Sequence, residues 1–406
     1  MAGLRFRSKV IGVTLILLML ATLGVALRIQ PLKIVQASSV IIVPDDYATI
    51  QDAVGNASAG DTVYVRAGTY VCTLTIDKPL SLRGESNTNT TIALMDNPGG
   101  LMGIWITASN ITVSNFHIVP EVAYPPLAWM VDIDGGNSLI YNDIIVGNVF
   151  DGLGPNQEAI QIDSQKAMII GNSIVASTDG GVGIVVEDAD YCTIARNNVT
   201  GGWVGIDVFG KYHIIAFNNI ANETVQTMYG GITLDNACSN NVVVGNTLVG
   251  NYLGLSWWHI SLYDVVYHNN FEGNVNQAGS QLSSQAWDNG YPSGGNYWSD
   301  YNGSDVFSGP YQNVTGSDGI GDTPENLSSG AADHYPLMNP VSANEIVGDI
   351  NFDGKVDIKD VAIAAQLFGL NSLDVRWNPL ADVGGYSKID IRDISLIARN
   401  FGKSWL

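Results

Sequence analysis

Oxygen-bearing side chains recur at a fixed spacing near the C-terminal end of the chain, in the segment DINFDGKVDIKD. Numbered along a twelve-residue loop, they fall at positions 1, 3, 5, 9 and 12, with a main-chain carbonyl at position 7. These donors are Asp349, Asn351, Asp353, Lys355 (carbonyl), Asp357 and Asp360. Because calcium takes six to eight hard oxygen ligands, the spacing predicts a Ca²⁺ site. An Asx-rich turn that only caps a helix is the alternative.

The pattern returns 33 residues later with fewer donors. Apolar, acidic and glycine positions match in pairs, among them Val356/Ile389, Asp357/Asp390, Asp360/Asp393, Phe368/Phe401 and Gly369/Gly402. The second loop keeps only Asp382, Asp390, Asp393 and the carbonyl of Lys388 as donors. Gly384, Tyr386 and Ser387 replace the remaining ligands and the turn glycine. We therefore expect one strong calcium site and one weak or empty site.

This paired arrangement, with Asn378-Pro379 leading into its second half, resembles a type I dockerin over nearly all of residues 348–406. The resemblance implies a small α-helical domain of paired EF-hand-type loops that binds a cohesin-domain protein when calcium is present. It also implies that the partner contacts the two helices through Ile358, Lys359, Ile391 and Arg392.

The middle of the chain repeats itself every 21 to 28 residues. Each repeat carries a buried-type Asn after an apolar pair, and the six that align are Asn148, Asn172, Asn197, Asn218, Asn246 and Asn269. A short alternating strand precedes each Asn, and no helical period is present. Repeats of this length fit one coil of a parallel β-helix, in which stacked Asn side chains hydrogen-bond from coil to coil. The fold class is therefore mainly β, a parallel β-helix solenoid.

Alternate residues of the repeated strands should point outward, and acids gather there. One outward column reads Asp134, Asp163, Glu187, Phe209, Asp235 and Trp258; the column two residues earlier reads Asp132, Gln161, Val185, Asp207, Thr233 and Ser256. Asp163, Glu187, Asp207 and Asp235 are the candidate catalytic acids, at separations suited to glycoside hydrolysis. Phe209, Trp257 and Trp258 are the candidate sugar-stacking residues. Three alternatives remain open: a solvated acidic face, a polysaccharide-binding face and a glycoside hydrolase or lyase site.

Both ends of the repeat region resemble known β-helix proteins. The stretch from Asp45 to Gly84 is similar to the opening of right-handed β-helix proteins that act on or bind carbohydrate, with a capping helix at Thr49 to Asn56. The tail GGNYWSDYNG, DGIGDTP and DHYPL resembles NosD-type proteins. That resemblance implies copper handling, yet His117, His213, His259, His268 and His334 are scattered, and copper needs imidazole or soft ligands brought together. Asp318 and Asp322, with Asp300 or Asp305, suit either a further calcium ion or a tight glycine turn.

Composition bounds the partners and the location. The net charge of −21 comes from 18 basic against 39 acidic residues, which makes nucleic acid an improbable partner. Arg5, Arg7 and Lys9 precede an apolar run, which predicts a signal peptide or membrane anchor over residues 1–37. We expect a β-helix over 43–338, a linker over 339–347 and the dockerin-like domain over 348–406. These features together predict an exported or cell-surface protein that binds or processes polysaccharide and is tethered to a cohesin-bearing partner. A non-catalytic structural or adhesion protein is the alternative.

Overall fold

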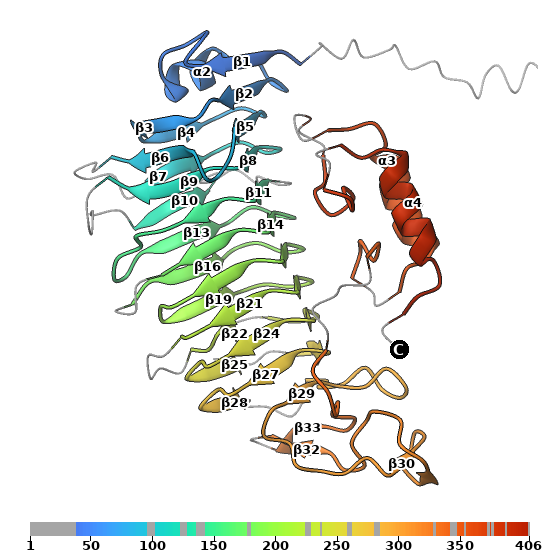
Figure 1. Cartoon of the computed structure of the whole chain (residues 1–406). Coiled ribbons are helices and arrows are strands. Elements are labelled where there is room, and N and C mark those ends of the chain that lie inside the picture. Colours follow the sequence, from blue (N-terminus) through green and yellow to red (C-terminus); the bar gives the residue numbers. More distant parts are fainter. Residues whose placement is uncertain are drawn as a thin grey trace, which may run out of the picture. The chain divides into compact units, whose positions relative to one another are not determined.

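Three parallel sheets run along the central region, because each coil of the chain contributes one short strand to each sheet (Figure 1). The computed structural model describes residues 38–404 apart from 96–101, 122–127, 135–142, 177–179, 224–228, 236–237, 258–261, 280–284, 328–329, 342–346, 353–354, 372–373, 375–376 and 386–387. The predicted right-handed parallel β-solenoid is confirmed.

The three sheets, called A, B and C here, have ten, ten and nine strands. Sheet A consists of β1 (Val40–Val43), β2 (Thr62–Val65), β5 (Ser81–Gly84), β8 (Thr112–Ser114), β11 (Ile144–Val146), β14 (Met168–Ile170), β17 (Thr193–Ala195), β20 (Ile214–Ala216), β23 (Val242–Val244) and β26 (Val265–Tyr267). Sheet B consists of β3 (Gly68–Cys72), β6 (Thr90–Leu94), β9 (His117–Pro120), β12 (Val149–Phe150), β15 (Ser173–Val175), β18 (Asn198–Thr200), β21 (Asn219–Ala221), β24 (Thr247–Val249), β27 (Asn270–Glu272) and β29 (Tyr297–Trp298). Sheet C consists of β4 (Leu74–Ile76), β7 (Met102–Ile106), β10 (Trp129–Ile133), β13 (Glu158–Ile162), β16 (Val182–Val186), β19 (Val204–Val208), β22 (Ile232–Leu234), β25 (Leu253–Trp257) and β28 (Asn276–Gly279).

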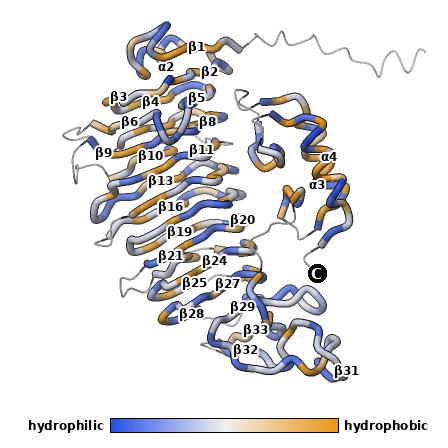
Figure 2. Tube along the Cα trace, in the orientation of Figure 1, coloured by the Kyte–Doolittle hydropathy of each residue, from blue (hydrophilic) through white to orange (hydrophobic). Residues whose placement is uncertain are grey.

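The core of the solenoid is a set of apolar columns that run from coil to coil. On sheet C one inward column passes through Ile162, Val186, Val208 and Leu234, which pair in parallel register. All four side chains are fully buried. Figure 2 shows the same hydrophobic segments recurring in each coil. β-branched side chains suit these short pleated strands, so the repeat sequence alone builds the core.

The predicted asparagine ladder is confirmed. In each rung the backbone N–H of one Asn donates to the side-chain oxygen of the Asn in the next coil, at 2.9–3.0 Å from Asn148 through Asn269. Each amide nitrogen in turn donates to a backbone carbonyl of the preceding coil, as Asn218 does to Ile194. These amides are at most 1% exposed. The side-chain amides of the ladder are thus hydrogen-bonded, which offsets the penalty of burying them.

Each open end of the solenoid is covered. The helix that the resemblance implied at Thr49 to Asn56 is α2 (Ile50–Asn56), with Thr49 as its N-cap, and it packs Ile50 and Val54 into the solenoid core at the N-terminal end. At the other end Asn296 adds one more rung, and its N–H donates to the buried carboxylate of Asp333 at 2.7 Å.

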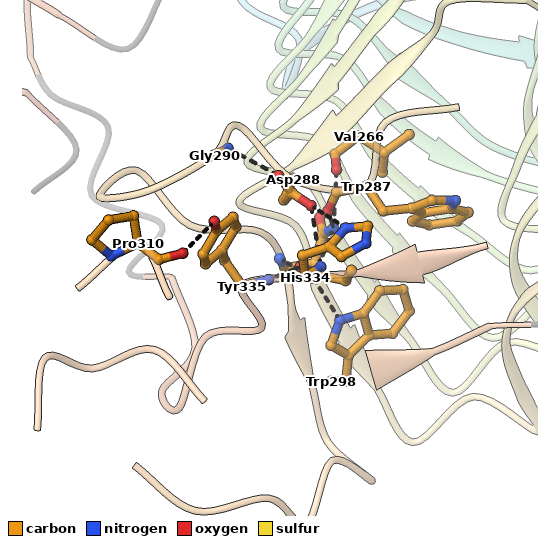
Figure 3. Close-up of polar contacts among 10 residues, drawn as sticks. Val266, Trp287, Asp288, Gly290, Trp298, Pro310, His334 and Tyr335 are labelled. Atoms are coloured by element: carbon orange, nitrogen blue, oxygen red, sulfur yellow. Dashed lines mark hydrogen bonds and ion pairs between the residues drawn. The ribbon is translucent and has the colours of Figure 1, made fainter. Parts of the chain in front are cut away.

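The tail motif resembling NosD-type proteins builds this second cap. Trp298 donates its indole N–H to Asp333 and stacks on Phe271, with ring centroids 4.3 Å apart. In the same cluster His334 contacts Asp288 and Tyr335 donates to the carbonyl of Pro310 (Figure 3). Two antiparallel pairs lie nearby in sequence, β30 (Phe307–Ser308) with β31 (Val314–Thr315) and β32 (Glu325–Asn326) with β33 (Ala332–Asp333).

The C-terminal module contains two helices, α3 (Ile358–Gln366) and α4 (Ile391–Asn400). Each half binds the turn that follows the other half's helix. Val356 donates to the carbonyl of Lys403 and accepts from Gly402, while Ile389 donates to Leu370 and accepts from Gly369. The equivalent residues of the two halves are 33 apart, as in Val356/Ile389, Leu370/Lys403 and Gly369/Gly402, so the sequence duplication appears as reciprocal pairing. Two short loop–helix units too small to fold alone thereby share one core.

Candidate functional site

The two outward columns on sheet C lie in the predicted register. Pairing between strands joins Asp132 to Gln161, Gln161 to Val185, Val185 to Asp207, and Asp207 to Thr233. The second column follows directly after each strand, where the backbone N–H groups of Asp163, Glu187 and Asp235 each donate to the coil before. The structure therefore brings the four candidate catalytic acids together along one face.

Burial and mutual repulsion raise the pKa of several acids on this face. Burial is the larger cause for Asp207, whose pKa rises to about 8, and the charges of Asp235 and Glu187 add to it. Burial, followed by the charges of neighbouring acids, also raises the pKa of Asp132 to about 7 and that of Asp163 to about 6. Oδ1 of Asp207 is buried and has no hydrogen-bond partner in the described part of the chain. Burial and the neighbouring charges therefore favour the protonated form of Asp207.

Two residues join this face that the sequence columns did not include. Glu158, at the start of β13, accepts a hydrogen bond from the indole of Trp129 at 2.8 Å, and burial raises its pKa to about 7. Burial and the charges of Asp207 and Asp235 raise the pKa of Tyr229, so this phenol lies near both acids. Glu158 is an acid at a strand position whose partner on β16 is the apolar Val182, and this was the only sequence signal for it.

Gln161 connects acids of neighbouring coils. Its amide nitrogen donates to Asp163 at 3.2 Å and to Glu187 at 3.3 Å. The amide thereby holds two carboxylates that would otherwise repel each other, which orders this part of the face before any ligand binds.

The aromatic residues behave differently from the prediction. Trp257 is wrong as a sugar-stacking residue, because it ends the inward column after Leu234, is 3% exposed and packs against Trp287. Its side chain lies on the opposite face of the strand from the acids. Phe209 is half-buried at the rim of the face, where its N–H pairs with Val186. Trp258 lies outside the described residues.

The raised pKa of Asp207 makes the stability of the protein depend on pH. The folded state holds this proton more tightly than the unfolded state, whose Asp titrates near 3.8. The free energy of unfolding should therefore fall as the pH rises from about 4 to 8, by on the order of 5 kcal/mol for this group. Asp207→Asn cannot ionise, so it should flatten that part of the curve. Urea unfolding between pH 5 and 9 checks this, with exposed Asp77→Asn as the control; parallel curves for Asp207→Asn and wild type would contradict it.

In the C-terminal module each of the two loops folds around a buried acid of its own. Asp360 accepts from the backbone N–H groups of Ile350 and Asp357, at 2.8 Å each. Asp393 accepts from Gly384 and Asp390 in the same way. Asp357 and Asp390 cap α3 and α4, and each forms a capping box with the buried acid.

The other predicted donors lie around these two acids. Asp349 and Asp382 are buried, Asn351 is half-buried, and Lys355 and Lys388 are exposed at bridges to Ser404 and Asn371. Asp353 lies outside the described residues, as do Gly354, Tyr386 and Ser387. Within the described ranges no three His, Cys, Asp or Glu side chains converge on one point. The donors that are present are hard oxygens on a closed loop, which is the chemistry that calcium prefers.

A difference between the halves appears at Asp390. The guanidinium of Arg392 binds its carboxylate at 2.8 Å, and this hydrogen bonding lowers the pKa of Asp390 to about 2. The carboxylate at this position of the second loop is thus already neutralised by a cation. That contact agrees with a second loop that binds metal weakly.

Apolar side chains occur in exposed pairs on the module. Ile358 and Ile391, at equivalent helix starts, are 67% and 64% exposed, and Phe368 and Phe401 are 53% and 55% exposed. Lys359 and Arg392 beside them are exposed too. All four residues for which the resemblance implied partner contact therefore lie on the surface.

The imidazoles do not form a copper site. Both ring nitrogens of buried His213 contact backbone atoms, the N–H of Cys192 and the carbonyl of Phe209, and burial lowers its pKa to about 4. His117 contacts Asp151, and His268 contacts the carbonyl of Ser293. These rings lie on different coils, and His259 is outside the described residues. The described residues therefore do not fit a copper ion.

The acids of the tail cap backbone turns. Asp305 accepts from the N–H groups of Asp318 and Gly319, and Asp322 accepts from Val306 and Phe307. These contacts agree with the tight-turn alternative for this segment.

Comparisons with known proteins concern the solenoid. Residues 54–303 match the family described as periplasmic copper-binding protein (NosD). No curated protein matches the chain. No helix in the described ranges is both long and apolar enough to cross a membrane.

Three solved structures illustrate the likeness of fold. A Geobacillus virus E2 protein, ORF18, is 14% identical, with 71% of this chain and 62% of that chain covered and a TM-score of 0.44. This chain thus spans less than two thirds of that protein. The pectin methylesterase from Aspergillus niger is 17% identical over 62% and 91% of the two chains, with a TM-score of 0.39. A PL6 alginate lyase is 12% identical over 73% and 76%, with a TM-score of 0.45. Similarities at sequence identities this low show a likeness of fold alone.

Proposed function

The chain belongs to the NosD family, and from that premise we propose that it is an exported protein that binds polysaccharide along the outer face of sheet C. The observation that carries the proposal is the set of acids on successive coils of this face, with the Gln161 amide hydrogen-bonded to two of them. These acids are Asp163, Glu187, Asp207 and Asp235. Carboxylates and carboxylic acids side by side accept from and donate to sugar hydroxyls. Each coil adds about 4.8 Å along the axis of the solenoid, so the face is extended in one direction, as a polymeric ligand requires.

Cleavage of the bound glycan is a second candidate, favoured by the raised pKa of one acid on this face. Burial and neighbouring charges raise the pKa of Asp207 to about 8, which suits the general acid of glycoside hydrolysis. Asp207 would protonate the leaving oxygen, and the carboxylate of Glu187 or Asp235 would activate water. Coil spacing and strand rise place the Cα atoms of Asp207 and Glu187 about 8 Å apart, which leaves room for that water.

A glycan panel that reads binding and cleavage separately tests both candidates. Wild type should retain at least one polysaccharide, and Asp207→Ala should weaken that binding by about tenfold because the carboxyl group and its hydrogen bonds are lost. If wild type also releases reducing ends, Asp207→Asn should lower that rate by about a hundredfold or more. Glu121→Gln, at an exposed acid that follows β9 of sheet B, is the control away from this face. A wild-type protein that neither binds nor cleaves any glycan would favour the structural or adhesion alternative.

We propose further that residues 348–406 tether the solenoid to a cohesin-domain protein and that calcium in the first loop is needed for this. Reciprocal pairing of the two halves and the exposed Ile358/Ile391 and Phe368/Phe401 pairs support the proposal. When bound, calcium would be held by the first-loop donors around Asp360 and would fix the start of α3. Pull-down of a type I cohesin, with and without chelator, tests the tether.

A further inference from the structure

A column of exposed side chains runs along the edge between sheets C and A. It contains the turn residues Lys166, Tyr191, Tyr212, Asn240 and Tyr263, one from each successive coil. Hydrogen bonds fix their register, since each of the first four donates its N–H to the residue just before the next member. Parallel bridges from Lys211 through Ser239 to Leu262 place the last coils in the same register.

The tyrosines of this column adopt a backbone conformation that tyrosine rarely adopts. The φ angles of Tyr191, Tyr212 and Tyr263 are 61°, 61° and 64°, in the left-handed region where Gly and Asn are favoured. Asn240, at 58°, is the residue type expected there. The tyrosine rings are also 52%, 46% and 68% exposed, so core packing does not explain them. An aromatic residue that is both strained and exposed, three times in one column, points to a use at the surface.

The geometry of the column leaves room for one ring. Tyr191 and Tyr212, on adjacent coils, stack with their centroids 4.8 Å apart and an angle of 12° between them. Tyr212 and Tyr263 are two coils apart, which corresponds to about 9.6 Å, and exposed Asn240 occupies the coil between them. Because their φ angles lie within a few degrees of one another and their coils are in parallel register, we expect their Cα–Cβ bonds to point in similar directions. One flat ring therefore fits between the two tyrosines at the stacking distance seen one coil earlier.

We propose that Tyr212, Asn240 and Tyr263 form a slot for a single sugar ring. A pyranose has apolar C–H faces that stack on aromatic rings and hydroxyls around its rim, and the Asn240 amide can both donate to and accept from those hydroxyls. The slot follows the same coils as the acid face, since Phe209 stands three residues before Tyr212 in the chain. The inference rests on the proposed function, because the slot would give the same polysaccharide a second contact at the edge of sheet C.

Filling the slot from within tests the proposal. Asn240→Tyr completes the tyrosine column with a residue type that the neighbouring coils already hold, so the fold should persist and the slot should close. Tyr263→Asn removes one wall and places a favoured residue at a positive φ. Each variant should weaken binding of a tetrasaccharide by about tenfold or more, measured by calorimetry. The probes are cellotetraose, mannotetraose, tetragalacturonate and an alginate tetramer. Lys166→Asn, in the same column but away from the slot, should bind like wild type.

The possible results separate this proposal from the acid-face proposal. Unchanged binding in both slot variants, with melting temperatures like wild type, would overturn the slot and leave the acid face standing. Binding lost in Asn240→Tyr but retained in Asp207→Ala and Asp163→Asn would support the slot and overturn the acid face as the glycan site. If wild type binds none of the four probes, both proposals fail for these sugars. Equal weakening by Lys166→Asn would show that the whole column, not the slot, makes the contact.

Discussion

Asp360→Asn should abolish tight calcium binding to the full chain, whereas the equivalent change in the second half, Asp393→Asn, should leave it intact. Both acids are fully buried and both accept backbone N–H groups in their own loop, so the two substitutions perturb the fold to a similar degree. They differ in the loop around them, since the first loop offers more oxygen donors and the second has Asp390 bound by Arg392. Removing a charged ligand from position 12 should weaken the first site by roughly a hundredfold or more.

Calorimetric titration of calcium into chelator-treated protein measures this. Wild type and Asp393→Asn should each show one tight equivalent, and Asp360→Asn should show none. Asp207→Asn controls for cations held by the acid face. Two equal tight equivalents in wild type would contradict unequal halves, and the absence of any would contradict the calcium proposal. Cohesin capture should follow the calcium result variant by variant if the metal orders the partner-binding surface.

Asn218→Ala should lower the free energy of unfolding by about 3 to 5 kcal/mol. The Asn218 amide accepts from the backbone and side-chain nitrogens of Asn197, at 2.9 Å each, and donates to Ile194 and Asn246. Alanine would leave the buried N–H of Asn197 without its acceptor and would remove the amide hydrogen bonds to Ile194, Asn197 and Asn246, and a buried group left unpaired costs about 1 to 3 kcal/mol. Because a solenoid holds together only through adjacent coils, the loss would also uncouple the coils on either side.

The next residue in the chain provides the matched control. Asn219 is exposed, and its amide donates to the Asn198 side chain at the surface. Asn219→Ala should change the unfolding free energy by about 0.5 kcal/mol or less. Urea unfolding followed by far-ultraviolet circular dichroism measures both. Similar midpoints for the two variants would show that the buried ladder does not stabilise the solenoid.

Local periodicity in the sequence predicted much of this molecule. The period-2 alternation of strands determines which residues face out, so Asp132, Gln161 and Asp207 could be aligned from the sequence alone. The Asn ladder was likewise predictable, because it depends on one position in each repeat, whereas the capping helix at Thr49 to Asn56 was implied by the resemblance to other β-helix proteins. The 33-residue duplication predicted a module of two equivalent halves, and the reciprocal bonds of Val356 and Ile389 agree with it.

Other features depend on which coils become neighbours and on how deeply each side chain is buried. The prediction for Trp257 was wrong because it relied on the acids nearby in the sequence, whereas the strand register places Trp257 after Leu234 in the inward column. Glu158 and Tyr229 join the acid face only through neighbours on other coils, and the pKa of about 8 for Asp207 comes mainly from burial. The one-ring gap at Asn240 exists only because Tyr212 and Tyr263 fall two coils apart in register. The sequence by itself thus determined the repeat, the facing of its residues and the duplicated loop, since these follow from local spacing. Only the tertiary structure decided the protonation of the acids and the spacing of the aromatic rings, since both depend on contacts between distant parts of the chain.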